Sequence, residues 1–335
     1  MSLVSELAEM LTCARPAGSD TERMFIARYV STLPGSYQDT CQNWHVVTDA
    51  SSRTLWSSHT DTVHHTEGRQ TVHYDPKDTT LRLSKRSRKR MSCLGADDTV
   101  GVWICREMLR AKVPGHYVFH YGEERGCVGS CAIVGSRPDI FTGLDYAIAL
   151  DRRGTRDVIT HQAYGRCCSD VFARSLARQL RKVGRYRPSP HGVYTDTAEY
   201  TDIVRECTNL SVGYDCEHSD RESVDYWHAL KLCHALMGLD EDRLVCDYKA
   251  GEGKGEGKSL PDAPYAEQVW QMEAYRKLFW RMGTDTRGWR IYYRWDKVWY
   301  AFDHIGALWT DEVLGEFRPH GGAFTTAEIA AQCAS

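Results

Sequence analysis

Over the first 245 or so residues, short apolar segments alternate with amphipathic helical patterns. Such alternation is typical of an α/β fold built on a largely parallel sheet. The predicted strands are Thr54–Ser58, His116–Tyr121, Tyr146–Leu150 and Asn209–Tyr214. The predicted helices, which follow an amphipathic N-terminal helix that contains Leu3, Leu7, Met10 and Leu11, are Asp20–Leu33, Thr99–Ala111, Asp170–Val183 and Val224–Met237.

The segment GEGKGEGK at residues 251–258 interrupts this pattern. It is rich in glycine and charge and contains no apolar residue, so we expect a flexible linker there. We therefore predict three parts: a large domain over residues 1–250, the linker at 251–258, and a small domain over 259–335. The last part holds six of the ten tryptophans, and its run WRIYYRWDKVWYAF predicts a hairpin that turns near Asp296–Lys297. We interpret these aromatic side chains as the core of a small α+β domain rather than a recognition surface.

The charge balance argues against several kinds of partner. A formal net charge of -3 gives no bulk attraction to nucleic acid or to an anionic membrane. Residues 259–335 carry eight Lys/Arg against ten Asp/Glu, so this part does not favour nucleic-acid binding either. The basic run RLSKRSRKR at residues 82–90 is interpreted as a solvated surface rather than a nucleic-acid contact.

The distribution of apolar residues and cysteines in the sequence predicts the cellular compartment. No stretch approaches the roughly 18 to 20 apolar residues that a membrane span needs, and the N-terminal segment lacks the features of a secretion signal. The 13 cysteines are scattered and have no structural-zinc spacing, which favours reduced thiols in the core. We therefore expect a cytoplasmic protein without membrane association.

Histidine and carboxylate residues follow the predicted strands or begin a predicted helix. In chain order they are His59 and Asp61 in SSHTDTV, Asp97 and Asp98 in LGADDTVG, Glu123 and Glu124 in YGEERG, Asp151 in AIALDRRG, and His218 in CEHSD. Ligands of open α/β sheets bind outside the carboxyl ends of the strands. Carboxylates gathered there repel one another unless cations neutralise them, and two divalent cations would do so. Each motif alone is weak, whereas their ordered co-occurrence is specific.

The order H-x-D, GADD-x-x-G, GEE-x-G, a strand-end Asp and a distal His resembles the zinc exopeptidase superfamily. That group includes aminopeptidase T, bacterial leucyl aminopeptidases, glutamate carboxypeptidases and desuccinylases. The resemblance covers roughly residues 1–240 and does not extend to the tail. It implies a three-layer αβα core with a mostly parallel sheet. It also implies two Zn²⁺ per chain, with Co²⁺ or Mn²⁺ as substitutes, and hydrolysis of an amide bond.

The resemblance also implies a role for each residue. The metal ligands would be His59 and Asp151 at the first zinc, Glu124 and His218 at the second, and Asp97 bridging both. Asp61 would orient His59, and Glu123 would be the general base. A cis peptide bond would join Asp97 to Asp98. Asp196, in the segment GVYTDTAEY, would lie near the metals.

Three departures from the family pattern matter. Thr99–Val100 follow the two aspartates, where many relatives carry Lys-Gly or Lys-Ala. Asp151 and His218 are only 67 positions apart, too few for the large lid domain of two-domain relatives, so we expect no lid. The sequence therefore does not identify the hydrogen-bond donor to the oxyanion that a lid would otherwise supply, and Tyr194 and Tyr200 are candidates. The 38 positions between His59 and Asp97 are more than in compact relatives and include the basic run.

Three functions stay open, with an aminopeptidase favoured. The strand-end ligand Asp151 is an aspartate, which resembles the aminopeptidases, whereas glutamate is commoner there in carboxypeptidases. The first alternative is an N-acyl amino acid deacylase or a carboxypeptidase, and the second is a non-catalytic binding protein. The presence of Glu123 and of all five ligand candidates favours an enzyme. The expected partner is thus a peptide or N-acyl amino acid substrate.

Overall fold

The computed structural model describes residues 3–162, 165–248, 291–295, 298–302 and 308–310. The chain divides into two compact units, Met1–Lys258 and Ser259–Ser335, and each is described by itself. Within the described ranges, no helix combines the length and apolar character that a membrane span requires.

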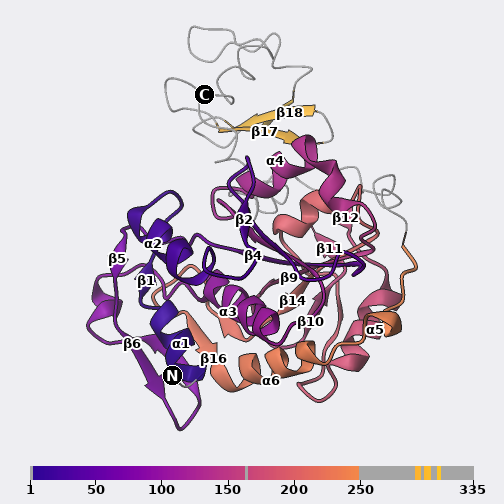
Figure 1. The fold of residues 1–335 in the computed structure, drawn as a ribbon. Helices are drawn as coiled ribbons and strands as arrows, with labels where there is room; N and C mark the ends of the chain where they lie inside the picture. The colour runs from indigo at the N-terminus through magenta and orange to yellow at the C-terminus, as the bar shows by residue number, and fades with distance from the viewer. Residues whose placement is uncertain (1–2, 163–164, 249–290, 296–297, 303–307, 311–335) are drawn as a thin grey trace, which may run out of the picture. The chain divides into compact units, whose positions relative to one another are not determined.

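An eight-stranded sheet forms the centre of the first unit (Figure 1), in the order β13-β10-β14-β9-β4-β8-β3-β2. Its strands are β2 (Tyr37–Gln38), β3 (Trp44–Val47), β4 (Thr54–His59), β8 (His116–His120), β9 (Tyr146–Arg152), β10 (Asp157–Ile159), β13 (Arg187–Ser189) and β14 (Glu206–Ser211). The four central strands, β14, β9, β4 and β8, run parallel, and antiparallel pairs flank them. The central strands β4, β8 and β14 are buried along their whole length, as expected for a sheet covered on both faces.

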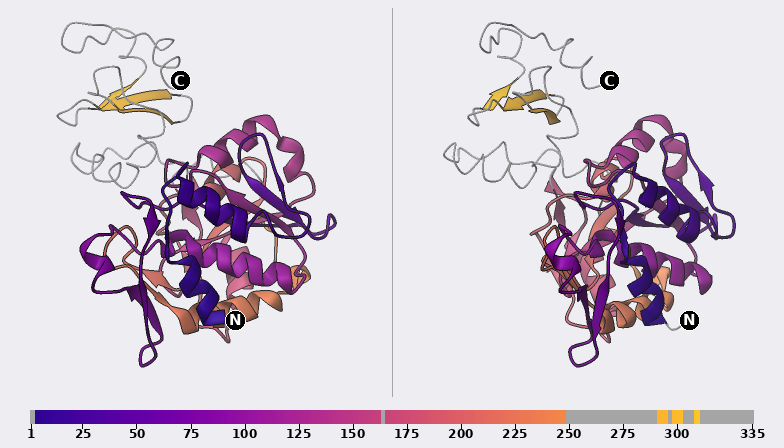
Figure 2. Two further views of the ribbon diagram at one scale, coloured as in Figure 1. Left: turned by 60° about the vertical axis from the view of Figure 1, so that its left-hand side comes forward. Right: turned by 90° about the vertical axis from the view of Figure 1, so that its left-hand side faces the viewer.

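Helices cover both faces of this sheet. They are α1 (Leu3–Met10), α2 (Asp20–Tyr29), α3 (Ala96–Arg110), α4 (Val128–Ser136), α5 (Asp170–Gln179) and α6 (Tyr226–Met237), with short 3₁₀ helices η1 (Ser87–Lys89), η2 (Pro138–Phe141), η3 (Asp196–Tyr200) and η4 (Glu241–Arg243). Because strand side chains alternate, Trp56 packs into the core beneath α3 and α6, whereas its neighbour Leu55 packs into a second core beneath α4. Figures 1 and 2 show α4 on the opposite side of the sheet from α3. The predicted three-layer α/β architecture is confirmed.

Smaller sheets border the main one. They are β15 (Tyr214–Asp215), β16 (Ser223–Asp225), β7 (Thr80–Leu83) and β6 (Val72–Asp75) in a four-stranded sheet, β1 (Cys13–Ala14) with β5 (Gly68–Arg69), and β11 (His161–Gln162) with β12 (Gly165–Arg166). The four-stranded sheet joins the chain segment before Asp97 to the segment that contains His218. Between Asp151 and His218 the described residues form β10 to β15 and α5, which belong to this unit, so no lid domain is inserted among them.

Several predicted boundaries are wrong, for identifiable reasons. The strand predicted at Asn209–Tyr214 covers Glu206–Ser211, and Tyr214 belongs to the separate strand β15. The helix predicted from Val224 begins at Tyr226, because Asp225 caps it by accepting a hydrogen bond from the backbone N–H of His228 at 2.9 Å. The helices predicted to reach Leu33 and Val183 end earlier. Their last apolar residues are buried in the turns that follow the helices.

In the second unit the described residues form a three-stranded antiparallel sheet. Its strands are β17 (Ile291–Trp295), β18 (Val298–Phe302) and β19 (Leu308–Thr310). Trp295 lies opposite Val298, so the strand pairing predicted for the aromatic run is present. The predicted turn near Asp296–Lys297, the predicted linker at 251–258 and the rest of the predicted accessory domain lie outside the described residues.

Candidate metal centre

Three of the predicted site segments meet at one edge of the sheet. Strands β4, β8 and β9 are mutually parallel, so their carboxyl ends lie side by side. His59 is the last residue of β4, and Asp151 is the second-last residue of β9. Glu123 and Glu124 follow β8 after a turn in which Gly122 has a φ of 66°, a value that favours glycine. The strand ends therefore bring these four side chains to the same place.

Asp97 reaches this edge from the first turn of α3. Its backbone is not helical, with φ -75° and ψ 104°, and the peptide bond to Asp98 is cis, as the resemblance implies. The carboxylate of Glu222 accepts hydrogen bonds from the backbone N–H groups of Leu94 (2.8 Å), Gly95 (2.7 Å) and Asp97 (3.0 Å). A single buried carboxylate thus holds the turn that presents Asp97.

His218 approaches from the opposite side, in the loop between β15 and β16. Its φ of 58° is left-handed, and the same loop carries Glu222. One short loop therefore supplies a candidate ligand and the carboxylate that positions another.

The carboxylate of Asp97 lies between two groups of side chains. Its Oδ1 is 2.9 Å from Nε2 of His59, and its Oδ2 is 3.0 Å from Nε2 of His218. Asp151 Oδ1 is 3.5 Å from the same His59 nitrogen, and Glu124 Oε1 is 2.9 Å from the same His218 nitrogen. The side chains therefore form two potential ligand groups that share Asp97, namely His59–Asp97–Asp151 and Asp97–Glu124–His218, beside a third group without it, His59–Glu123–Glu124. Within each group the ligand atoms lie within 4.8 Å of one another.

The donor set suits a pair of divalent cations. Imidazole nitrogen and carboxylate oxygen are common zinc ligands, and a shared carboxylate is suited to bridging two ions. Burial, with Asp151 nearby, raises the pKa of Asp98 well above its ordinary value. Burial disfavours a charged His59, yet hydrogen bonds to Asp151, Asp61 and Asp97 raise its pKa well above its ordinary value. The raised pKa of His59, and the contribution of Asp151 to the raised pKa of Asp98, reflect negative charge that bound cations would neutralise.

A second set of side chains holds the candidate ligands in place. Asp61 accepts hydrogen bonds from the backbone N–H groups of Glu123 and Glu124, both at 3.1 Å, and its Oδ1 is 3.4 Å from Nδ1 of His59. Thr195 donates its hydroxyl to Asp151 Oδ2 at 2.8 Å. These contacts fix side chains that would otherwise rotate, which is the usual function of groups surrounding metal ligands.

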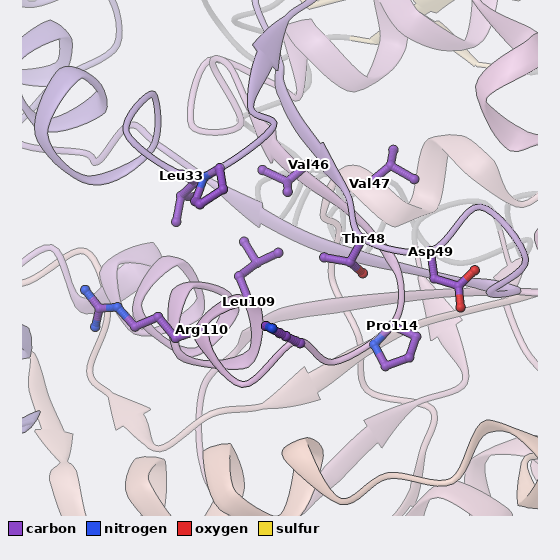
Figure 3. Close-up of a pocket in the computed structure, with 10 residues that line it drawn as sticks. Leu33, Val46, Val47, Thr48, Asp49, Leu109, Arg110 and Pro114 are labelled. Carbon is purple, nitrogen blue, oxygen red and sulfur yellow. The ribbon is translucent and has the colours of Figure 1, made fainter.

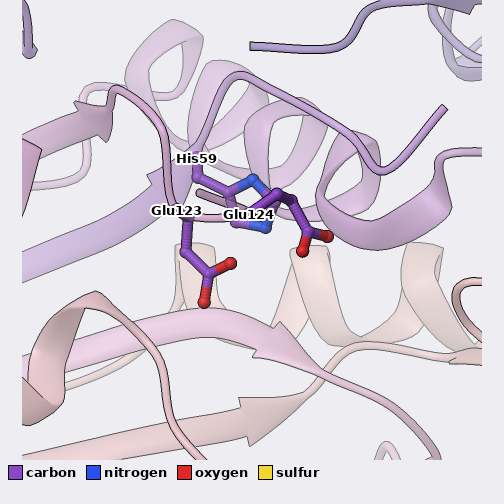
Figure 4. Close-up of side chains that lie close together, drawn as sticks. All are labelled: His59, Glu123 and Glu124. Carbon is purple, nitrogen blue, oxygen red and sulfur yellow. The ribbon is translucent and has the colours of Figure 1, made fainter. Parts of the chain in front are cut away.

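Glu123 lies beside the two ligand groups. Its carboxylate and that of Glu124 point in different directions next to His59 (Figure 4). Glu123 is 1% exposed, and the thiol of Cys127 lies 3.7 Å from its Oε1. A buried carboxylate beside the ligands, on the same turn as Glu124, is suited to accepting a proton from a water held at the centre.

Known structures share this architecture. Aminopeptidase PepT from Bacillus cereus aligns with a TM-score of 0.58 and 13% identity, covering 72% of this chain and 98% of that one. A tripeptidase from Staphylococcus aureus gives 0.58 and 11%, again covering 72% and 98%. The TET1 peptidase of Pyrococcus horikoshii gives 0.50 and 15%, covering 70% and 98%. No family model and no curated protein sequence matches the chain.

Over most of its length, the chain has the fold of these peptidases. The fold that the resemblance implies is thereby confirmed. Within this peptidase fold, the candidate centre occupies the carboxyl edge of the parallel strands, where bound ligands are expected in α/β sheets.

Several residues around the centre of this peptidase fold were not predicted. Glu222, Thr195 and Tyr214 each hold a candidate ligand. Glu222 and Tyr214 lie in a loop and a short strand whose sequences carry no motif. Thr195 lies in the segment GVYTDTAEY, in which only its neighbours were singled out.

Two further residues that the sequence analysis named lie in buried positions. Asp196 accepts a hydrogen bond from Ser130 at 2.5 Å, and burial raises its pKa to about 7. Tyr200 is fully buried with its hydroxyl 3.2 Å from Nε2 of His120, and its assignment as an oxyanion donor stays a prediction.

A hollow elsewhere on the peptidase fold contains none of these residues (Figure 3). It lies beyond the end of α3 and the start of β8, and its lining includes Leu33, Val46, Leu109 and Pro114. Because β4, β8 and β9 are parallel, the start of β8 is the edge of the sheet opposite to the candidate centre. We assign this hollow no function.

Proposed function

We propose that the chain is a co-catalytic di-zinc hydrolase that cleaves amide bonds, and that it acts as an aminopeptidase on peptides. The position of Asp97 between His59 and His218 carries this proposal, because it divides five side chains into two ligand groups with one shared carboxylate. Two-metal sites of this kind hold both the attacking and the departing group of a hydrolysis.

The contacts divide the proposed ligands between two metal sites. His59 and Asp151 would bind one zinc, Glu124 and His218 would bind the other, and Asp97 would bind both. When bound, the ions supply positive charge that lowers the pKa of a water and polarises the scissile carbonyl. Co²⁺ and Mn²⁺ accept the same nitrogen and oxygen donors and are expected to substitute.

Glu123 is the proposed general base. It accepts the proton of the attacking water at its carboxylate and passes that proton to the departing amine. Asp61 keeps Glu123 in position through its hydrogen bond to the backbone N–H. Because Glu123 is buried, little bulk water competes for its carboxylate.

The choice of an aminopeptidase rests on two observations. The strand-end ligand is Asp151, an aspartate as in the aminopeptidases of the superfamily, and the solved structures of similar fold are described as an aminopeptidase, a tripeptidase and a TET1 peptidase. A free α-amino group is a cation that the carboxylates of the centre can accept.

The test uses the full-length chain with its bound metals counted. Substrates are aminoacyl amides and peptides with a free amino group, beside the same compounds with an N-acetyl group. We expect about two zinc ions per chain and cleavage of the free-amino series alone. Release of acetate from the N-acetyl series would establish the deacylase alternative. Cleavage of peptides in both series that requires a free C-terminal carboxylate would establish the carboxypeptidase alternative. A fully loaded protein that cleaves neither series would show that the chain is a binding protein.

A further inference from the structure

Basic side chains lie near four of the five candidate ligands in the sequence. Arg125 directly follows Glu124, Arg153 lies two residues after Asp151, and Arg221 lies three residues after His218. The segment that leads to Asp97 contains the basic run noted above. All these side chains are exposed, and together they are called the cationic rim: Lys85, Arg86, Arg88, Lys89, Arg90, Arg125, Arg153 and Arg221.

Contacts tie the cationic rim to the centre. Arg88 Nε lies 2.8 Å from Asp220 Oδ2, and Asp220 is two residues from His218. Arg153 Nη1 lies 3.3 Å from Glu217 Oε1, and Glu217 is the neighbour of His218. The basic run therefore borders the His218 loop, and so does Arg153, which directly follows the strand that carries Asp151.

Positive charge exceeds negative charge on these loops. The acidic side chains beside His218 are Asp215, Glu217 and Asp220, and the last two already pair with rim residues. Among the described residues, Arg125 and Arg221 form no ion pair. The carboxylates of the centre itself, such as Asp97 and Glu124, face inward to His59 and His218. The exposed side chains of these loops are thus mainly guanidinium and ammonium groups.

We propose that the substrate carries a carboxylate close to the scissile amide bond and that the cationic rim binds it. This inference rests on the proposed hydrolase function and specifies its substrate class. The carboxylate has two sources, an Asp or Glu side chain or a free C-terminus one or two residues from the cleaved bond. Guanidinium groups suit either source, because their paired N–H donors match the two carboxylate oxygens. Surface charges of one sign around a cleft also accelerate the arrival of oppositely charged substrates.

Three matched tripeptides test this inference with the metal-loaded, full-length protein. They are Leu-Gln-Ala amide, Leu-Glu-Ala amide and Leu-Gln-Ala with a free carboxylate. We expect kcat/KM to be about tenfold higher for at least one carboxylate peptide than for the neutral peptide, and this ratio to shrink in added salt. The peptide that gains identifies the source of the carboxylate. Equal values for all three peptides would overturn the inference and leave the proposed function intact.

Two double variants, matched in charge, locate the effect. Arg125→Gln/Arg153→Gln removes two rim charges, whereas Lys112→Gln/Arg243→Gln removes two exposed charges near the other edge of the sheet. The carboxylate preference should disappear in the first variant, mainly through KM, and persist in the second. A preference that survives in both variants would show that the rim does not bind the carboxylate.

A binding measurement tests carboxylate binding by the cationic rim independently of amide hydrolysis. In the Glu123→Gln protein with its metals counted, a fluorescent carboxylate peptide should bind more tightly than its neutral amide counterpart. If the wild-type protein cleaves no peptide and this difference persists, the proposed function fails while the carboxylate-binding rim stands. Equal affinities of the two peptides would reject the rim.

Discussion

Tyr214 donates its hydroxyl to both the backbone carbonyl of Asp151, at 2.9 Å, and to the Oδ1 atom of its side chain, at 3.0 Å. This contact fixes the candidate ligand at two points. Because Tyr214 belongs to β15 and Asp151 to β9, it also connects the small sheet that precedes the His218 loop to the central sheet.

Replacing Tyr214 with Phe should weaken metal binding while leaving the fold intact. The change removes one hydroxyl, so Asp151 loses a fixed orientation, and such losses typically reduce metal affinity about 10- to 100-fold. Zinc affinity is measured by competition with a chelator. Tyr186→Phe is the control, because that buried hydroxyl contacts Ser211 and His228 and no candidate ligand. An unchanged zinc affinity in Tyr214→Phe would show that Asp151 needs no such anchor or binds no metal.

The neighbouring glutamates should respond differently to the same change. Glu123→Gln preserves shape but removes the proposed base, so both metals should remain while kcat falls on the order of a hundred- to ten-thousand-fold. Glu124→Gln should instead lower metal content at limiting zinc, because a neutral amide is a poorer ligand than a carboxylate.

Metal content and turnover, measured on the same samples, separate these two roles. Loss of metal in Glu123→Gln with full loading of Glu124→Gln would mean that the roles are reversed. Since the ligand atoms of His59, Glu123 and Glu124 also lie within 4.8 Å of one another, this reversal is a real alternative in the geometry.

Chelation should destabilise the protein. Without cations, Asp97, Glu124 and Asp151 face one another in a buried site, and the binding energy of the metals is also lost. We expect the melting temperature to fall by roughly 10 °C in excess chelator and to recover when zinc is returned. Asp97→Asn provides the comparison, because its melting temperature should depend much less on the chelator.

Acid should weaken the ion pairs that join Glu6 of α1 to Arg106 and Arg110 of α3. Hydrogen bonding from Arg110, helped by Arg106, lowers the pKa of Glu6 to about 2. Because the folded-state pKa lies below the ordinary value, the stabilisation is present above about pH 4.5 and is lost as the pH falls toward 2. The difference in free energy of unfolding between wild type and Glu6→Gln, measured by urea titration, should therefore shrink over that range. A difference that is constant with pH would rule out this ion pair as the cause.

Truncation after Ala250 should leave a folded, metal-binding enzyme that cleaves small substrates, because every candidate site residue precedes the predicted linker. Zinc content and turnover of the truncated chain check this expectation. Normal zinc binding with no turnover would mean that residues 259–335 contribute to the active site and that the predicted domain division is wrong.

The sequence predicted β4, β8 and β9 to within two residues at each end, because each has apolar residues at its centre and is followed by polar residues. His59, Glu123 and Asp151 could be placed at one edge for that reason, since parallel strands share their carboxyl ends. The short strands β2, β10 and β13 were missed because each has only two or three residues. Glu222 was missed as well, because its importance lies in three backbone N–H groups more than 120 positions away in the chain.

The single carboxylate of Asp61 contacts three groups: the ring of His59 and the backbone N–H groups of Glu123 and Glu124. A substitution of Asp61 would therefore disturb both metal binding and the orientation of Glu123, the proposed proton acceptor. Added zinc could restore metal occupancy, but it could not restore the turn that carries Glu123. Metal affinity and proton transfer are thus coupled through Asp61, and a change at this residue cannot alter one without the other.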